Sequence, residues 1–308
     1  MRIVFLGTPE FAVPSLQALV SAGHKVLAVL TQPDRPKGRG NAIAESPVKM
    51  AAKALALPVH QPERVRRPEA VEQLQQLAPD LMVVVGYGQI IPQNIIDIPP
   101  HGILNVHASL LPKYRGAAPI QWTIANGETE TGVTIMQIDA GLDTGDMLLK
   151  ASTPIEPDET APELSARLAP LGADLLIRAI AEMERGTITR EKQDNSQATL
   201  APILKREDGR IDWLRSATEN YNRLRGFTPW PGAYTFFRGQ QLNVTRARIA
   251  DVDVRPGAVR VENRRLFAGC GGDTCLELLE LQLAGKKRMS AEAFLNGYKL
   301  SANDVLGD

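Results

Sequence analysis

The sequence opens with RIVFLG at residues 2–7, an apolar run that ends in glycine and precedes a helical pattern over residues 14–22. Further apolar runs at residues 26–30 and 81–85 are separated by a second helical pattern at residues 47–55. Short apolar runs that alternate with helical segments are typical of a parallel sheet covered by helices. The first part of the chain therefore predicts an α/β fold, a Rossmann-like, doubly wound and mostly parallel sheet.

The same rhythm continues beyond the first hundred residues. Strands are expected at residues 102–107 and 133–138, with a helix at residues 118–125 between them. The pattern of apolar and polar residues at 163–183 predicts a long amphipathic helix. Glycine at residue 186 marks its expected end, because helices commonly end at glycine.

A change of pattern divides the chain into two expected domains. Residues 190–206 are polar and lack clear periodicity, so we interpret them as a linker between a domain at residues 1–189 and a domain at residues 207–308. The second domain has short strand-like runs separated by Gly and Pro, at residues 233–237, 241–249, 257–261, 265–268 and 276–283. This spacing favours an OB-like β-barrel.

The composition excludes several classes of protein. With 44% hydrophobic and 23% charged residues among 308, and no apolar run long enough to cross a bilayer, we expect no membrane segment. The first strand follows Met1 directly, so the cytoplasm is the expected compartment. The two cysteines, Cys270 and Cys275, are too few for a zinc site and are expected to be reduced. No metal is expected.

The net charge of zero conceals an asymmetry. Residues 1–189 carry a net charge of −4 and residues 190–308 a net charge of +4. Residues 205–248 contain nine Lys and Arg residues but only four acidic residues. Such an excess can attract a polyphosphate, but charge alone favours a solvated surface.

The first strand and turn do not predict a dinucleotide site. The turn GTPEF at residues 7–11 has one glycine where the dinucleotide fingerprint has three. Pro9 also removes a backbone N–H from the turn that donates to a pyrophosphate. Asp34 resembles a ribose-binding acid only by its place near the second strand. A plain strand-to-helix turn is the better interpretation.

Two polar side chains stand on the strand ILNVH at residues 103–107. Asn105 and His107 are two positions apart and therefore project from the same face, near the carboxyl end of the strand, where ligands bind in α/β sheets. Asp143 lies in the loop after the next strand, between Gly141 and Gly145, which permit a tight turn. We expect Asn105, His107 and Asp143 to meet.

An amide, an imidazole and a carboxylate support the transfer of a small acyl group to an amine. The amide of Asn105 can donate to the oxygen that gains charge in a tetrahedral intermediate, and His107 can add a second donor. Asp143 can orient the imidazole and accept the proton of the attacking amine. None of the three is a good nucleophile, which favours direct transfer from an activated donor.

At these residues the chain resembles the folate-dependent formyltransferases, whose signature is Asn-x-His followed by a distant Asp. The longer runs HASLLPKYRGAAPI at residues 107–120, TGVTIM at 131–136 and GLDTGD at 141–146 resemble the branch of the family that acts on initiator tRNA. The resemblance implies 10-formyltetrahydrofolate as the formyl donor and the α-amino group of methionine on initiator methionyl-tRNA as the acceptor.

The resemblance also implies where the folate binds. In this family the segment after the catalytic histidine contacts the folate, and the pterin lies between the segment after the fourth strand and the loop of the catalytic aspartate. The corresponding residues are Ser109, Leu110, Leu111, Pro112, Gln89, Ile90, Ile91 and Asp139. Core packing is the alternative interpretation of the two isoleucines.

The resemblance also implies which basic residues contact the tRNA. Arg35, Lys37 and Arg39 lie in a Pro- and Gly-rich loop that matches the family's tRNA-binding insertion, although the loop alone is typical of a solvated surface. Lys286 and Lys287 lie in a segment that resembles the family's C-terminal domain. Trp230, between two prolines, is expected to be buried in the core; stacking on a nucleotide is the alternative interpretation.

Two other classes of function remain open at this point. A formyltransferase or formyl-folate hydrolase that acts on a small molecule would share the fold, but would not need the basic loop or a second basic domain. A noncatalytic RNA-binding protein would have no use for the three polar residues. We expect a monomer that uses formyl-folate and initiator tRNA.

Overall fold

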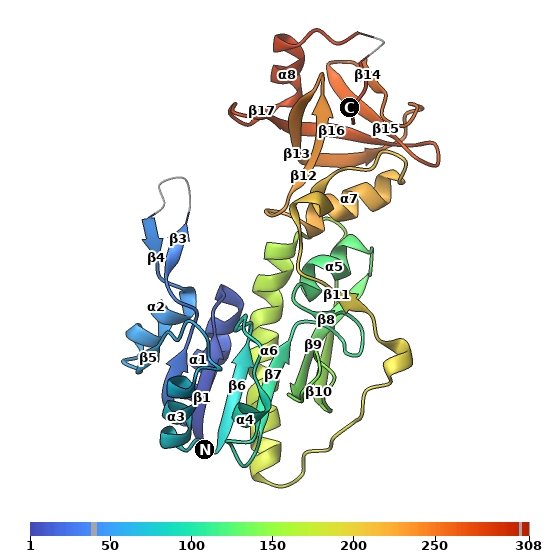
Figure 1. The fold of residues 1–308 in the computed structure, drawn as a ribbon. Coiled ribbons are helices and arrows are strands. Elements are labelled where there is room, and N and C mark those ends of the chain that lie inside the picture. Colours follow the sequence, from blue (N-terminus) through green and yellow to red (C-terminus); the bar gives the residue numbers. More distant parts are fainter. Residues whose placement is uncertain (38–41, 302–303, 308) are drawn as a thin grey trace. The chain divides into compact units, whose positions relative to one another are not determined.

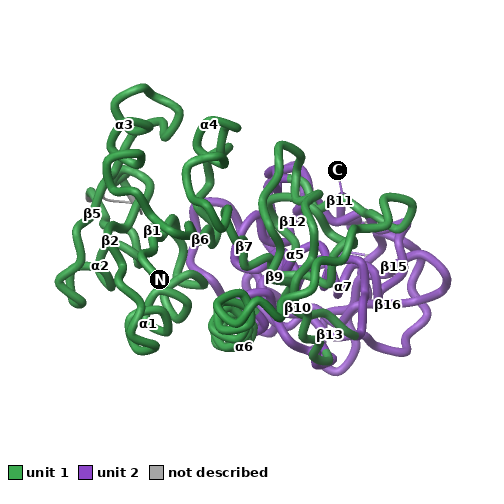
Figure 2. Tube along the Cα trace, turned by 90° about the horizontal axis from the view of Figure 1, so that it is seen from below, with its two compact units in different colours: residues 1–119, 130–154, 165–202 green, residues 120–129, 155–164, 203–308 purple. Residues whose placement is uncertain are grey.

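The computed structural model describes residues 1–37, 42–301 and 304–307 of the chain. These residues form two compact units, coloured separately in Figure 2. Unit 1 comprises residues 1–119, 130–154 and 165–202, and unit 2 comprises residues 120–129, 155–164 and 203–308. Each unit has its own sheet.

A seven-stranded sheet forms the centre of unit 1, in the order β10-β9-β7-β6-β1-β2-β5 (Figure 1). Its strands are β1 (Arg2–Gly7), β2 (Lys25–Leu30), β5 (Val59–His60), β6 (Leu81–Val85), β7 (Ile103–His107), β9 (Glu130–Gln137) and β10 (Met147–Pro154). The strands from β5 to β7 in this order pair in parallel, whereas β9 pairs antiparallel with both β7 and β10. The predicted mostly parallel sheet is confirmed.

Helices cover both faces of this sheet, with α3 and α4 on one face and α1 and α6 on the other (Figure 2). The helices are α1 (Val13–Ser21), α2 (Pro47–Ala54), α3 (Pro68–Leu77), α4 (Gln93–Ile96) and α6 (Ala161–Glu184), and a 3-10 helix, η1 (Glu10–Ala12), precedes α1. Side chains of α3 and α4 pack in one core with alternate residues of β1, β2 and β6. The sheet is therefore doubly wound, as predicted.

Strand β10 is absent from the sequence-based expectation, and its composition explains why. After Met147 and Leu148 its residues alternate between half-buried and exposed positions. A strand at the edge of a sheet needs no continuous apolar run, so its sequence gives a weak signal. A short hairpin also follows β2, made of β3 (Arg35–Lys37) and β4 (Ala42–Ala44).

The segment between α6 and unit 2 is held against unit 1. It contains a 3-10 helix, η2 (Asn195–Gln197), and the strand β11 (Leu200–Ala201). Strand β11 pairs in parallel with β8 (Arg115–Gly116), and Glu191 forms a two-bond backbone bridge with Met147. Residues 165–202 consequently belong to unit 1.

An antiparallel sheet forms the centre of unit 2, in the order β12-β13-β16-β15-β14, with β17 paired to β16. Its strands are β12 (Ala233–Phe237), β13 (Gln240–Ala250), β14 (Val259–Glu262), β15 (Arg265–Cys270), β16 (Thr274–Leu283) and β17 (Met289–Ser290). In the described part of the chain no ladder joins β12 to β14. Instead, Leu306 bridges to Phe237 and Val305 bridges to Ala258, so the C-terminal segment links the two ends of the sheet.

The helices of unit 2 are α5 (Pro119–Ala125), α7 (Ala217–Gly226) and α8 (Ala291–Gly297), and a 3-10 helix, η3 (Arg206–Gly209), precedes α7. Ser216 and Glu219 form a capping box that starts α7. Phe227, which follows α7, is 1% exposed and meets the ring of Trp122 edge-on at 5.2 Å between centroids.

The expectation that Trp230 is buried is wrong. Its side chain is 56% exposed. Phe227, three residues earlier, takes the core position in this turn, so the aromatic ring between the prolines is left at the surface. Cys270 and Cys275 are buried free thiols, and burial raises the pKa of Cys270 to about 11.

One buried carboxylate stabilises the sheet of unit 2. Glu277 on β16 accepts hydrogen bonds from Arg265 at 2.5 and 2.8 Å and from Arg248 at 2.6 Å. These bonds, Arg265 first, lower the pKa of Glu277 to about 2 from its ordinary 4.5. Because the folded pKa is depressed, the stabilisation is present above pH 4.5 and is lost as the pH falls through about 2.

We therefore predict that Glu277→Gln lowers the free energy of unfolding at pH 7 by about 1–3 kcal/mol. The difference from the parent should shrink as the pH is lowered below 4.5. Urea unfolding followed by circular dichroism at several pH values measures it. Glu262→Gln is the matched control, because its pair with Arg260 is exposed. Equal losses in the two variants would contradict the prediction.

Candidate active site

Strand β7 presents Asn105 and His107 on one face of the sheet, at its carboxyl end. The strand lies between β6 and β9, and the two side chains are 9% and 5% exposed. Ile103, on the same face by the two-residue period, packs in the core formed with α3 and α4. Buried polar groups require hydrogen-bond partners, so the surroundings of Asn105 and His107 have to supply them.

The loop after β9 supplies the first partner, Asp143. Within this loop the carboxylate of Asp139 accepts hydrogen bonds from the backbone N–H of Gly141 and from the hydroxyl of Thr144. Asp143 itself has a φ of +51°, in the left-handed region that non-glycine residues adopt only when their surroundings hold them. Asp139 therefore shapes the loop, and Asp143 is the carboxylate that faces β7.

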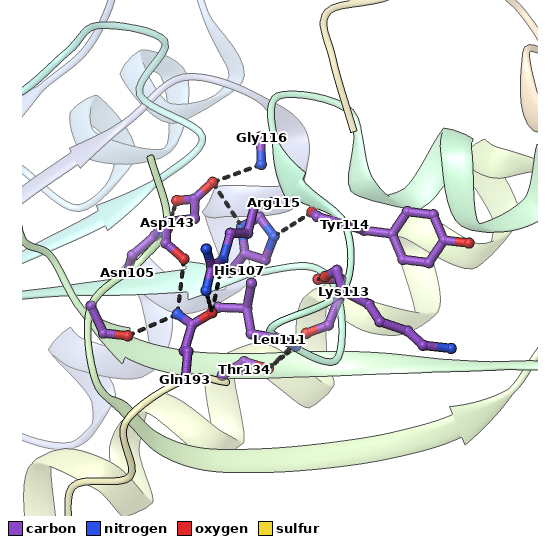
Figure 3. A network of polar contacts seen from close by, with 12 residues as sticks. Asn105, His107, Leu111, Lys113, Tyr114, Arg115, Gly116, Thr134, Asp143 and Gln193 are labelled. Carbon is purple, nitrogen blue, oxygen red and sulfur yellow. Dashed lines mark hydrogen bonds and ion pairs between the residues drawn. The ribbon is translucent and has the colours of Figure 1, made fainter. Parts of the chain in front are cut away.

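The three predicted polar residues come together (Figure 3). The side-chain N–H of Asn105 donates to Oδ1 of Asp143 at 3.3 Å, and Nδ1 of His107 lies 3.7 Å from Oδ2. The backbone N–H of Gly116 also donates to Oδ2, at 2.8 Å. The carboxylate of Asp143 thus has partners on both oxygens, and it remains 17% exposed.

The contacts of His107 fix which ring nitrogen faces the carboxylate. Its Nε2 lies 2.9 Å from the carbonyl oxygen of Tyr114, which can only accept a hydrogen bond. Nε2 therefore carries a hydrogen, and Nδ1 is the nitrogen that faces Asp143. The 3.7 Å between Nδ1 and Oδ2 of Asp143 is longer than a hydrogen bond.

The segment between β7 and β8 is held by side chains of the sheet. Thr134 of β9 donates to the carbonyl of Ser109 at 2.7 Å and accepts from the backbone N–H of Leu111 at 3.1 Å. The hydroxyl of Ser109, which is fully buried, donates to the carbonyl of Lys113 at 2.6 Å. Leu111 packs against Met136 and Met147. These bonds place Tyr114 and Gly116 beside the polar residues.

Two residues that sequence reasoning missed complete this network. Arg115 is 6% exposed, and its guanidinium donates to the side-chain oxygen of Gln193 at 2.8 and 3.0 Å. Gln193 in turn donates to the backbone carbonyls of Asp143 and Gly145, both at 2.8 Å. The polarity of the segment around Gln193 suggested only a linker, and its distance along the chain concealed the contact.

The predicted folate residues outside this network differ in burial and in hydrogen-bond partners. Leu110 and Pro112 are half-buried. Gln89 is bonded to the loop before α3, where its oxygen accepts from the N–H of Val65 and its nitrogen lies near the carbonyls of Pro62 and Glu63. Ile91 packs against the core of unit 1. Ile90 is 91% exposed, so the alternative that it packs in the core is wrong.

The predicted tRNA residues lie in two places. Arg35 is exposed on β3 and lines a cavity of about 640 Å³ with residues of the loops after β1, β2 and β6. Lys37 is the last residue of β3, and Arg39 lies outside the described residues. Lys286 and Lys287 are exposed in the turn after β16. Asp34, the residue considered for a ribose, bonds to Lys49 and Gln61.

Two further findings concern metals and membranes. Among the residues that the structure describes, no three His, Cys, Asp or Glu side chains are grouped so that they could hold a metal ion. In the same part of the chain, the helices are all too short or too polar to span a membrane.

Comparison with known proteins agrees with this architecture. Residues 1–180 match the family model described as formyl transferase, and residues 203–299 match its C-terminal domain. Methionyl-tRNA formyltransferases from Solibacter usitatus and Koribacter versatilis are 63% and 59% identical to the chain, each covering 100% of it and 99% of the relative.

A solved structure shares the fold. The N-formyltransferase from Helicobacter canadensis, crystallised with folinic acid and dTDP-3-aminofucose, superimposes with a TM-score of 0.67. It is 18% identical and covers 90% of this chain and 98% of its own. The fold and the matched models define a formyl-group transferase. The chain belongs to the formyl transferase family and, within it, to the methionyl-tRNA formyltransferases.

We predict that Gly145→Ala lowers the turnover number for formyl transfer by about 10²-fold, because a small displacement of a catalytic group has effects of this size. A Cβ at Gly145 would lie 1.8 Å from the backbone oxygen of Gln137, so the Asp143 loop would have to move. Steady-state kinetics measure the change. Gly297→Ala is the control, since a Cβ there meets nothing within 4 Å. A turnover number equal to that of the control would contradict the prediction.

Proposed function

We propose that the chain transfers a formyl group from 10-formyltetrahydrofolate to the α-amino group of methionine on initiator methionyl-tRNA, giving N-formylmethionyl-tRNA. The observation that carries this proposal is the meeting of Asn105, His107 and Asp143 at the carboxyl end of β7, in a chain whose full-length relatives are named methionyl-tRNA formyltransferases. The protein would act in the cytoplasm and as a monomer.

The three residues have separate roles in a direct transfer. The amine nitrogen attacks the formyl carbon, the carbonyl oxygen becomes negatively charged, and the bond from the carbon to the donor nitrogen then breaks. The amide N–H of Asn105 stabilises the charged oxygen. Asp143 accepts the proton that the amine loses, directly or through water, and the released donor nitrogen takes up a proton.

His107 acts next to this carboxylate. Its Nε2–H is engaged by the carbonyl of Tyr114, so Nδ1 is the nitrogen available to the reacting groups. A hydrogen on Nδ1 can be donated to the charged oxygen or to Asp143. Burial of Asn105 and His107 strengthens these interactions, because the effective dielectric constant is lower there than in water.

The folate is proposed to bind along two segments of unit 1. Ser109, Leu110, Leu111 and Pro112 follow β7, and Asp139 shapes the loop of the catalytic carboxylate. Exposed Ile90 would cover an apolar part of the pterin, while Gln89 and Ile91 would hold the backbone of their segment.

The tRNA is proposed to bind through basic residues of both parts of the chain. Arg35, Lys37 and Arg39 on the loop after β2 would contact the acceptor arm, and Lys286 and Lys287 would contact phosphates from the domain at residues 207–308. A small acceptor would require neither set of cations.

Incubation with a formyl-labelled donor and methionyl initiator tRNA tests the proposal. Label should appear in formylmethionyl-tRNA. Release of labelled formate without that product would indicate a hydrolase, and transfer only to a small amine would indicate a different acceptor. Light scattering of the purified chain should give a mass near 33.5 kDa.

We predict that Asn105→Ala lowers the turnover number by about 10²- to 10³-fold, because one donor to the charged oxygen is lost. The KM for methionyl-tRNA should stay near that of the parent, since the side chain is 9% exposed and its proposed role is limited to the reacting oxygen. Single-turnover kinetics with saturating tRNA measure the chemical step. Unchanged turnover would remove Asn105 from the mechanism.

We predict that Arg39→Ala raises the KM for tRNA and reduces the slope of log affinity against log salt by about one, the amount expected for one lost phosphate contact. Filter binding at several salt concentrations measures the slope. Arg66→Ala is the control, because Arg66 is an exposed arginine outside the basic loop. Equal tRNA use by Arg39→Ala and the parent would contradict this assignment.

A further inference from the structure

The segment at residues 191–201 is built into the catalytic unit on both sides of Gln193. On one side, Glu191 and Met147 exchange backbone hydrogen bonds at 2.8 and 2.9 Å. On the other, Thr199 receives hydrogen bonds from the backbone N–H groups of Tyr114 and Arg115, both at 2.9 Å. Between these contacts, Gln193 lies beside the loop that contains Asp143 (Figure 3).

The partners of Gln193 define the orientation of its amide. Arg115 offers only donors, so the side-chain oxygen of Gln193 must face it. The amide nitrogen consequently faces the carbonyls of Asp143 and Gly145, which offer only acceptors. A side chain at residue 193 therefore has to offer one acceptor to Arg115 and donors to the two backbone carbonyls, and it has to be long enough to reach all three groups. Among the natural side chains glutamine meets this requirement.

Arg115 is in turn held in place. Its guanidinium also donates to the side-chain oxygen of Asn195 at 2.9 Å, and the residue is 6% exposed. A nearly buried guanidinium bonded to two amides keeps a fixed position. Arg115 thereby fixes Gln193, and Gln193 fixes the backbone of the Asp143 loop.

This chain of contacts matters because Asp143 is strained. Its φ of +51° is a conformation that costs a non-glycine residue energy and persists only where neighbouring groups hold it. The N–H of Gly116 and the amide of Asn105 hold the carboxylate, but they do not hold the backbone. The bonds from Gln193 hold the backbone carbonyl of Asp143 itself.

We propose that Gln193, oriented by Arg115, is a positioning residue for formyl transfer. It touches neither substrate nor reacting atoms, and it acts by holding the Asp143 loop in the conformation that places the carboxylate beside Asn105 and His107. The inference rests on the proposed function, because its effect is read in that reaction. The segment expected from its sequence to be a plain linker is thereby part of the catalytic frame.

Two substitutions separate this role from simple anchoring of the segment. Gln193→Ala removes all of the contacts. Gln193→Glu keeps an acceptor for Arg115, and strengthens that contact by charge, but it places a carboxylate oxygen against the two backbone carbonyls. Gln197→Ala is the matched control, since that exposed glutamine of the same segment bonds only to Asp194 among the contacts described for it.

The full-length variants are compared in the formylation assay with saturating donor and methionyl initiator tRNA. We expect Gln193→Ala and Gln193→Glu each to lower the turnover number by about 10²-fold, the usual effect of a small displacement of a catalytic group. The KM for tRNA should change by less than about threefold, and thermal midpoints should show that the variants remain folded. Gln197→Ala should match the parent.

The outcomes that overturn the inference are distinct. Parent-like turnover in Gln193→Glu would show that anchoring to Arg115 suffices, and parent-like turnover in Gln193→Ala would show that the contacts are dispensable. Equal proportional changes in turnover number and tRNA KM, or loss of folding in both variants, would indicate a general structural role. An inactive parent would instead reject the proposed function.

Discussion

The carboxylate of Asp143 is the point at which distant parts of unit 1 depend on one another. Strand β7 buries Asn105 and His107 in a sheet whose buried side chains are mostly apolar, and their polar atoms have to be satisfied there. The carboxylate of Asp143 contacts both side chains and also accepts a hydrogen bond from the N–H of Gly116. The other ring nitrogen of His107, Nε2, donates to the carbonyl of Tyr114. The requirement to satisfy two buried side chains therefore fixes the β7–β8 segment and the loop after β9 together.

The fold and the pairing of Asn105 with His107 could be predicted from the sequence because both follow short-range rules. Asp143 is 38 positions from Asn105, and it was predicted from its glycine-flanked loop and from the family resemblance. The two-residue period of a strand places Asn105 and His107 on one face. The apolar runs of the buried strands predict β7 and its neighbours. The edge strand β10 was missed because, after its first two residues, exposed side chains alternate with half-buried ones and interrupt the apolar run. The burial of Trp230 was predicted wrongly because a large aromatic side chain between two prolines is expected in the core, whereas Phe227 occupies the buried position of this turn.

The contact between Arg115 and Gln193 lies beyond such rules. The two residues are 78 positions apart, and neither a period nor a motif links them. A polar segment without periodicity has the composition of a linker, and the same polar side chains provide the donors and acceptors that a buried guanidinium and two loop carbonyls require. Sequence reasoning could therefore identify the three polar residues that meet at the end of β7, whereas the contacts of Arg115 and Gln193 could be identified only from the folded chain.

The side chains of Asn105 and His107 differ from that of Asp143 in the kind of element that carries them. Regular strands fix side-chain direction, so Asn105 and His107 are presented by β7 with little need of outside support. A loop has no such regularity, and the carboxylate that must approach β7 from outside the sheet is carried on a residue with a φ of +51°. The energy of that conformation has to be offset by neighbouring hydrogen bonds. Support is therefore concentrated on Asp143, where Gly116 and Asn105 bind the side chain and Gln193 binds the backbone.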